Sequence, residues 1–219
     1  MANISSASGT CHIITQSLED CEKLYHILHK SGTSNWTYET WYEEIDPDDT
    51  DTLPDGRHCL NISFSGAGRW SYLTNIESTF KWLKPVMTEE EWKFVTDTPF
   101  SLQYEYIDYE GGGAFLIRDF VTLTHHVGEK PDEVIVSEDI QDSYPYTPFW
   151  FYKIVYDGYL DEVLDGEFMF DFIEESEQKE LFDVTIKDYM SYYGLEHDEA
   201  KKKLLEDSKI FRETFGGDD

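Results

Sequence analysis

Basic residues are scarce in this chain of 219 residues, which has 17 lysines and arginines against 46 aspartates and glutamates. The formal net charge at pH 7 is therefore −29. Proteins that bind DNA, RNA or anionic membranes depend on cationic contacts with phosphate groups. The composition argues against direct nucleic-acid binding and against membrane binding, and a partner that is attracted by charge is expected to be basic.

Cysteine and long apolar runs are also scarce. The three cysteines, Cys11, Cys21 and Cys59, are odd in number and form no CxxC pair, which argues against a disulfide framework. No apolar run approaches the roughly 18 residues that a membrane-spanning helix needs. The N-terminus has no basic segment followed by an apolar one. We expect a reduced protein located in the cytoplasm.

Signatures of catalysis and of metal binding are missing as well. The GGG at 111–113 is not followed by the Lys-Ser or Lys-Thr of a phosphate-binding loop, and no GxSxG or HExxH occurs. The acidic segment 46–51 lacks the glycine of an EF-hand loop. Cys21, His26 and His29 follow one another at helical spacing but lack a fourth ligand for zinc. We therefore predict no catalytic residue, no metal and no cofactor, with a Mg-dependent hydrolase as a less favoured alternative.

Apolar and aromatic residues, by contrast, are plentiful. They make up 40% and 16% of the chain respectively, which is enough for a sizeable core despite the charge. The length fits one large domain, or one domain with a smaller appendage.

Local patterns predict helices interleaved with antiparallel strands. Strands are expected at 9–16, 35–45, 58–66, 100–109 and 114–126, with a further extended aromatic segment at 145–156. Helices are expected at 17–32, 72–83, 88–97, 185–194 and 197–216. In the helices, Ser17 is the expected N-cap of the first, and Thr88 with Glu91 forms a capping box in the third.

This order predicts an α+β fold of the ferredoxin-like, split βαβ kind, with an antiparallel sheet and helices on one face. The predicted domain covers residues 1–130. An acidic, aromatic and helical C-terminal region, residues 131–219, is expected to follow it and to pack on it.

Two stretches resemble a known family. HCLNISFSGAGRWSYLTNIESTFKWL and the later PFSLQYEYIDYEGGGAFLIRDFV resemble the YubB-type ferredoxin-like family of plasmid and phage proteins. The matching residues are Trp70, Tyr104, Glu105, Tyr106, Glu110, Gly112 and Phe115. The resemblance covers about residues 9–126, departs at Ser71-Tyr72, where the family has a proline-containing step, and has no counterpart for 130–219. It implies a ferredoxin-like fold and a mobile-element setting, and it assigns no functional residues.

The most unusual feature is the run DGYLDEVLDGEFMFDFIEESEQKELFD at 157–183, which holds eleven acidic residues and a single lysine. Its acids repeat at every fourth position, in Asp157, Asp161 and Asp165 and again in Glu167, Asp171 and Glu175. In a helix each step advances about 6 Å, and alternate residues of a strand lie about 7 Å apart. Both spacings approximate the distance between successive phosphates of a nucleic-acid strand. A second acidic block, 39–55, holds eight acids and no lysine or arginine.

These patterns favour a non-enzymatic inhibitor from a phage or other mobile element. Such a protein would occupy the basic nucleic-acid groove of a host defence protein, a restriction or CRISPR effector, with carboxylates in place of phosphates. The predicted partner-binding residues are Asp157, Asp161, Glu162, Asp165, Glu167, Asp171, Glu174 and Glu175, followed by Glu43, Glu44, Asp48 and Asp49.

Two other interpretations stay open. The acids can form a solvated surface that serves only solubility, as charge runs usually do. Alternatively, the chain can be an adaptor that binds proteins through exposed aromatic residues, because aromatics dominate interface hot spots. The candidates for that interface are Trp150 and Phe151, or Tyr189, Tyr192 and Tyr193.

Overall fold

The structure is a computed structural model, and it describes residues 4–33, 39–45, 49–69, 71–110, 115–155 and 175–215. The chain forms two compact units, Met1–Tyr144 and Pro145–Asp219. The last strand of the sheet belongs to the first unit, whereas the sequence-based boundary at residue 130 assigned it to the C-terminal region. Among the described residues, no helix is both long enough and apolar enough to cross a membrane.

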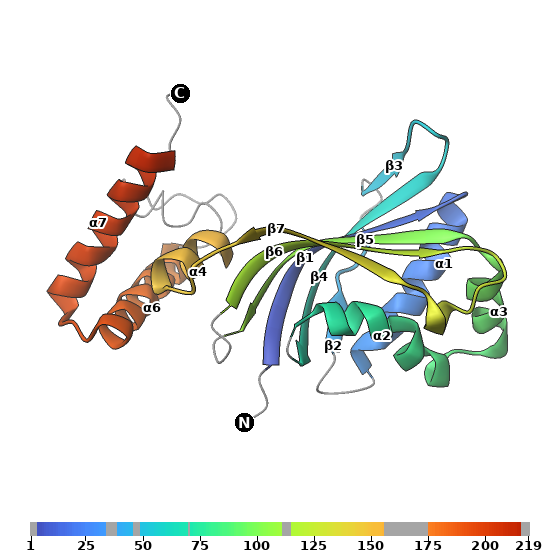
Figure 1. Ribbon diagram of the computed structural model, residues 1–219, viewed down its shortest axis with the longest axis horizontal. Coiled ribbons are helices and arrows are strands. Elements are labelled where there is room, and N and C mark those ends of the chain that lie inside the picture. Colours follow the sequence, from blue (N-terminus) through green and yellow to red (C-terminus); the bar gives the residue numbers. More distant parts are fainter. Residues whose placement is uncertain are drawn as a thin grey trace. The chain divides into compact units, whose positions relative to one another are not determined.

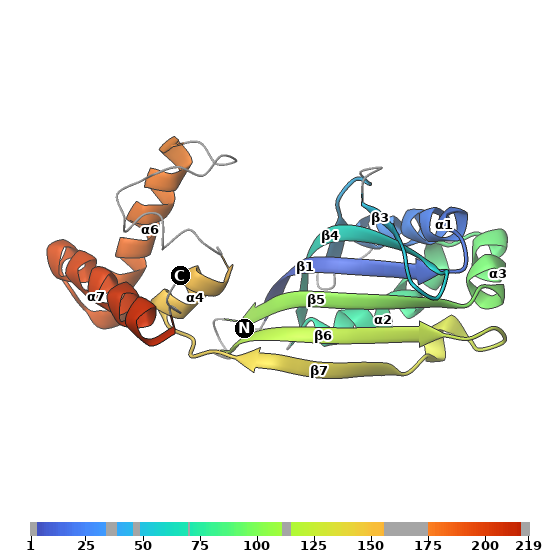
Figure 2. The ribbon, with the colours of Figure 1, turned by 90° about the horizontal axis from the view of Figure 1, so that it is seen from above.

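The first unit is built on one antiparallel sheet of seven strands (Figures 1 and 2). The strands are β1 (Ile4–Thr15), β2 (Glu39–Tyr42), β3 (Thr50–Thr52), β4 (His58–Arg69), β5 (Phe100–Glu110), β6 (Phe115–His125) and β7 (Val136–Ser143). They lie in the order β2-β4-β1-β5-β6-β7, and β3 pairs with the same edge of β4 as β2 does. The predicted α+β class is confirmed at this level. The ferredoxin-like layout is not confirmed, and the sheet is larger than that prediction required.

Among the described residues, three helices and three short 3₁₀ turns complete the first unit. The helices are α1 (Leu18–Leu28), α2 (Leu73–Leu83) and α3 (Glu89–Asp97), and the turns are η1 (His29–Thr33), η2 (Lys84–Val86) and η3 (Pro131–Glu133). Helix α1 contacts β1 and β4, while α2 contacts β4, β6 and β7. Figure 2 looks onto the opposite face of the sheet, with α2 passing behind the strands.

The alternation of side chains along the strands separates a core face from a polar face. On β5, Leu102, Tyr104 and Tyr106 are buried toward the helices, while Glu105 between them is exposed, as the period of two predicted. The buried tyrosines pair their hydroxyls: Tyr42 with Tyr104 at 2.9 Å, and Tyr72 with Thr40 at 2.6 Å. These pairs give the buried tyrosine hydroxyls hydrogen-bond partners inside the core.

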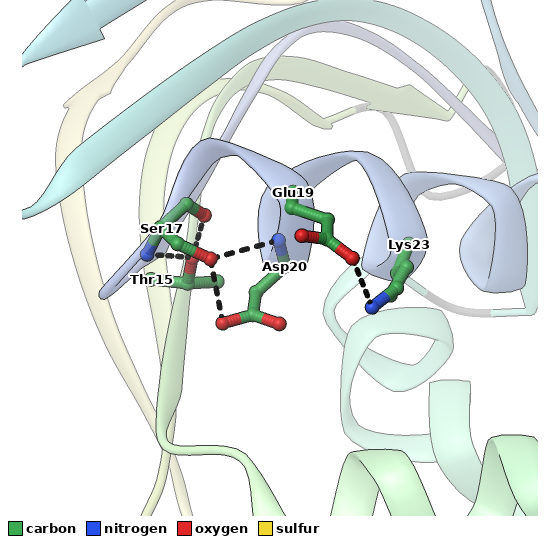
Figure 3. Close-up of polar contacts among 5 residues, drawn as sticks. All are labelled: Thr15, Ser17, Glu19, Asp20 and Lys23. Carbon is green, nitrogen blue, oxygen red and sulfur yellow. Dashed lines mark hydrogen bonds and ion pairs between the residues drawn. The ribbon is translucent and has the colours of Figure 1, made fainter.

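The predicted start of α1 is confirmed in atomic detail (Figure 3). The Ser17 side chain accepts a hydrogen bond from the backbone N–H of Asp20 at 3.2 Å, and its hydroxyl donates to the Asp20 carboxylate at 2.8 Å. The Thr15 hydroxyl donates to the Ser17 carbonyl at 2.6 Å, which fixes the turn out of β1. One turn into the helix, Lys23 pairs with Glu19 at 2.7 Å. The capping box of Thr88 and Glu91 at the start of α3 is confirmed as well.

The second unit is helical among its described residues. It contains α4 (Pro148–Val155), α6 (Glu175–Tyr193) and α7 (His197–Phe215). The extended segment predicted at 145–156 is wrong, because α4 occupies most of it. Its aromatic residues suggested a strand, but Phe149 and Tyr152 are three positions apart and pack into the small core of this unit. Pro148 stands in the first turn, where a proline costs no helical hydrogen bond.

Gly9 provides a test of the sheet's packing. A Cβ atom at this position would lie 2.1 Å from the Glu105 carbonyl oxygen and 2.6 Å from the Tyr106 Cα atom. Both neighbours are backbone, so β1 and β5 would have to separate. We expect Gly9→Ala to lower the free energy of unfolding by about 3 kcal/mol in denaturant titrations. Ser8→Ala, at the adjacent exposed position, is the control, and equal stabilities of the two variants would contradict this packing.

Candidate functional site

Most of the acidic run lies outside the described residues. This applies to Asp157, Asp161, Glu162, Asp165, Glu167, Asp171 and Glu174, and also to Asp48 of the second block. Glu175 is the first residue of α6, and its side chain is not described either. The proposed phosphate-like spacing in this run therefore stays a prediction.

The second acidic block does come together at one edge of the sheet. The backbone N–H of Glu43 donates to the Ser63 carbonyl at 3.0 Å, and the N–H of Asn61 donates to the Asp49 carbonyl at 2.8 Å. Ser63 and Asn61 are two residues apart on β4, so these backbones meet β4 about 7 Å from each other. We call Glu43, Glu44, Asp49 and Asp51 the acidic edge.

Neighbouring side chains hold the acidic edge in place. The Tyr25 hydroxyl of α1 donates to the Glu43 carbonyl at 2.9 Å. The Asn61 amide donates to the Asp51 carboxylate at 3.2 Å, while the Asn61 side-chain oxygen lies 2.6 Å from the His12 ring. Beside these acids, Trp41 is 47% exposed. The acidic edge thus combines carboxylates on a fixed backbone with an accessible aromatic ring, a residue type enriched at interface hot spots.

The opposite edge of the sheet is acidic too, and the sequence analysis missed it. Strand β7 exposes Glu138, Asp139 and Asp142, which we call the β7 edge. Its pairing with β6 shifts at Gln141, so that one extra residue bulges there. The β-branched run at 134–136 was the only signal for this strand. The acidic residues that follow this run argued against a strand, because acidic residues are depleted in strands.

One row of paired residues joins the two edges across the polar face. The row runs through Glu43, Ser63, Thr10, Glu105, Phe120 and Asp139. Directly opposed residues of neighbouring strands point to the same face, and neighbouring strands lie about 4.8 Å apart. The backbone positions of Glu43 and Glu105 are therefore about 14 Å apart, because three strand spacings separate them. Those of Glu105 and Asp139 are about 10 Å apart, because two strand spacings separate them. We call these three exposed carboxylates the acidic row.

A second group of acids is buried on the core face. Asp108 is fully buried, and its Oδ2 accepts a hydrogen bond from the backbone N–H of Tyr72 at 2.7 Å, at the start of α2. Asp119 is 1% exposed and accepts a hydrogen bond from the Tyr106 hydroxyl at 2.9 Å. Burial raises the pKa of Asp108 to about 6. Burial also raises the pKa of Asp119, and burial together with the charge of Asp119 raises that of Glu138.

Raised carboxyl pKa values are common in catalytic sites, but these groups have a structural explanation. Asp108 holds the start of α2 against β5, and Asp119 satisfies the hydroxyl of a tyrosine in the core. Neither carboxyl reaches the surface, so a substrate has no direct access to them in this structure.

The cysteine and the histidines that were considered as zinc ligands do not come together in the fold. His26 and His29 are exposed and flank the Tyr25 ring, with ring centroids 5.2 and 5.6 Å from it. Cys21 is buried and contacts the Thr15 hydroxyl at 3.3 Å instead. Within the described ranges, no three His, Cys, Asp or Glu side chains are close enough to hold a metal ion together. All three cysteines are free and buried.

The aromatic residues of the adaptor interpretation fall into different environments. Tyr189 is fully buried in the core of the C-terminal unit, so it is wrong as an interface residue. Trp150, Phe151 and Tyr193 are half-buried and pack against that core. Tyr192 is 57% exposed and stays available to a partner.

The buried Asp108 predicts a pH dependence of stability. Its pKa is raised in the folded state, so the folded chain binds more protons than the unfolded chain, and stability falls as pH rises through about 6. A shift of about two units corresponds to about 3 kcal/mol, of which about 1 kcal/mol falls between pH 5 and pH 7.5. In Asp108→Asn this loss should be absent, because the amide oxygen still accepts the Tyr72 N–H without carrying a charge.

The measurement is the free energy of unfolding in urea at several pH values in that range. Glu105→Gln removes an exposed carboxylate from the same strand and is the matched control. If Asp108→Asn and the unchanged chain lose stability in parallel as pH rises, the burial of an ionisable Asp108 is not what drives the dependence.

Comparison of the sequence with protein-family models gave no match, and comparison with curated proteins gave no match either. The resemblance to the YubB-type family therefore depends on its sequence motifs alone.

Proposed function

We propose that this chain is a non-enzymatic, acidic interaction protein of a phage or other mobile element. It inhibits a basic, nucleic-acid-binding defence protein of the host, a restriction or CRISPR effector, by occupying the groove that normally holds nucleic acid. The observation that carries this proposal is the acidic row, in which three exposed acidic residues lie on one line of paired residues across one face of the sheet.

The spacing of the acidic row suits such a groove. Its separations of about 14 and about 10 Å bracket the width of about 12 Å that the major groove of B-DNA presents between its phosphate backbones. Between Glu43 and Glu105 the row holds only the small hydroxyl side chains of Ser63 and Thr10, whereas Phe120 lies between Glu105 and Asp139. Lysines and arginines of a partner can therefore reach the carboxylates from one side.

The acids of this row also form no ion pair with the described lysines and arginines. Within the part of the chain that the structure describes, lysine and arginine form their ion pairs with other acids, such as Glu19, Asp55 and Asp97. No such pair there includes Glu43, Glu105 or Asp139. A surface that served solubility alone would gain nothing from holding unpaired charges in register, whereas a phosphate mimic depends on it.

The arrangement of the central strands supports the proposed mobile-element setting, because it agrees with the fold that the family resemblance implies. We propose that β1, α1, β2, β4, α2, α3 and β5 form a ferredoxin-like core, extended at one edge by β6 and β7. Strands β4 and β5 flank β1 on either side and are joined through α2 and α3, which is a split βαβ arrangement. This arrangement agrees with the resemblance to the YubB-type family.

A competition experiment tests the function itself. The tagged chain is incubated with host lysate at about 0.1 M salt, and bound proteins are challenged first with excess duplex DNA and then with about 1 M salt. We expect the retained proteins to be nucleic-acid-binding proteins that the duplex displaces, because both ligands use one groove. Retained partners that the duplex does not displace would contradict mimicry and favour the adaptor interpretation.

Charge reversal tests whether the acidic row is the contact. We expect the triple variant Glu43→Lys, Glu105→Lys, Asp139→Lys to weaken binding to the captured partner at least about tenfold, since several screened ion pairs are lost together. Each single reversal should change affinity much less. Affinities are measured by titration at low and high salt, and the triple variant should also show a weaker salt dependence.

The control for this test has the same change in net charge at a different place. Glu22→Lys, Glu90→Lys and Glu206→Lys alter three exposed acids on α1, α3 and α7. If both triple variants lose affinity equally, net charge rather than the acidic row determines binding. Circular dichroism of each variant establishes that the fold is retained.

A further inference from the structure

The C-terminal unit has an open pocket lined by aromatic rings and one carboxylate. Its volume is about 330 Å³, and its walls come from the segment at 146–151 and from the last two turns of α6. The residues that matter here are Tyr146, Phe151, Tyr192 and Asp188. No lysine or arginine is among the described residues that line it.

The side chains of the pocket are fixed by contacts within the unit. The Tyr152 hydroxyl donates to Oδ2 of Asp188 at 2.7 Å. Asp188 and Tyr192 are four residues apart on α6 and so share a face of the helix. Across from them, the Tyr146 and Phe151 rings have centroids 6.2 Å apart. A carboxylate can accept several hydrogen bonds, so the bond from Tyr152 leaves Asp188 with further acceptor capacity.

The same combination of groups already binds an ammonium group elsewhere in this unit. Lys203 Nζ lies 3.2 Å from Oδ1 of Asp207 and 4.6 Å from the centroid of the Tyr193 ring. The other oxygen of Asp207 accepts a hydrogen bond from the Tyr189 hydroxyl at 3.2 Å. Tyrosine hydroxyl, carboxylate and neighbouring ring thus form one recognisable environment for a lysine.

The first unit repeats the carboxylate and the ring of this environment, without the tyrosine hydroxyl. Lys84 Nζ lies 2.7 Å from Asp132 and 4.4 Å from the Trp92 ring centroid. A carboxylate and an aromatic face attract an ammonium group together, because the first accepts its hydrogen bonds and the second stabilises its charge. In this chain, then, a lysine repeatedly lies between an acid and a ring.

We infer that the pocket of Tyr146, Phe151, Asp188 and Tyr192 is a binding site for a lysine side chain of a partner protein. Its Asp188 corresponds to Asp207, its Tyr152 hydroxyl to that of Tyr189, and its Tyr192 ring to that of Tyr193, while none of the described residues that line the pocket supplies an ammonium group. The excess of 46 acids over 17 basic residues favours a cationic ligand at such a site. This inference does not depend on the acidic row, which belongs to the first unit.

A short peptide tests the pocket without knowledge of the partner. The probe is acetyl-Gly-Lys-Gly-amide, titrated to about 10 mM into the isotopically labelled full chain, with amide shifts recorded by NMR. The comparison peptide carries norleucine, which keeps the apolar stem and lacks the charge. We expect the lysine peptide alone to shift the amides of 146–151 and 188–192, with a dissociation constant on the order of 1 mM.

Three variants separate the pocket from general attraction to an acidic chain. Asp188→Asn still accepts the hydrogen bond of Tyr152 but lacks the charge, and we expect it to weaken lysine binding about tenfold. Asp183→Asn removes an exposed acid of the same helix that does not line the pocket, and it should leave the affinity unchanged. Tyr192→Leu, at an exposed position, should weaken binding by several-fold through loss of the ring.

Three results would overturn the inference. They are equal shifts with the norleucine peptide, lysine-induced shifts outside the pocket only, and an affinity that Asp188→Asn leaves unchanged. Because the probe is a peptide, the result is independent of the DNA competition experiment. If the chain binds the lysine peptide in this pocket but duplex DNA does not displace its partners, the pocket inference stands and the mimicry proposal fails.

Discussion

The continuous pairing of β1 with two neighbours is the constraint on which the first unit depends. Its residues from Ile4 to Thr15 pair with β4, and most of them pair with β5 on the other side. Because the strands are antiparallel and in fixed register, the position of every side chain on the polar face follows from this pairing. The close approach of the β5 backbone to Gly9 shows how little freedom the register leaves.

The net negative charge of the chain opposes folding, because the acidic residues repel one another. The fold places these residues where their repulsion is weakest. Acids that repel one another are distributed over sheet edges and helix surfaces, where water screens them. Unpaired edges of a sheet invite association with other strands, and charges and bulges at such edges prevent it. The acids at the acidic edge and at the β7 edge, together with the bulge at Gln141, therefore disfavour edge-to-edge association of sheets. The same residues supply the ends of the acidic row, which we propose as the contact with a partner.

Much of the fold could be predicted from the sequence where local signals agree with tertiary packing. Ser17 and Thr88 are side-chain caps of short range, and the alternation at Leu102, Tyr104 and Tyr106 fixes the core face of β5 directly. Strand β7 and helix α4 could not be found in this way. In β7 the pairing with β6 overrides a composition that is poor for strands, and in α4 the packing of Phe149 overrides a composition that favours them.

The candidate site, too, has a part that the sequence predicted and a part that it did not. An acidic block between 39 and 55 was visible in the sequence, but its alignment with Glu105 and Asp139 was not, because register over five strands is set by long-range pairing. The pocket at Asp188 was even less visible. Its rings and its carboxylate are common residue types in two helical segments. Their role as a binding site is inferred by comparison with the surroundings of Lys203 and Lys84 in the same chain. Lys203 and Lys84 each contact a carboxylate and an aromatic ring, and the pocket at Asp188 presents the same two groups, which is the basis of the proposal that it binds a lysine side chain.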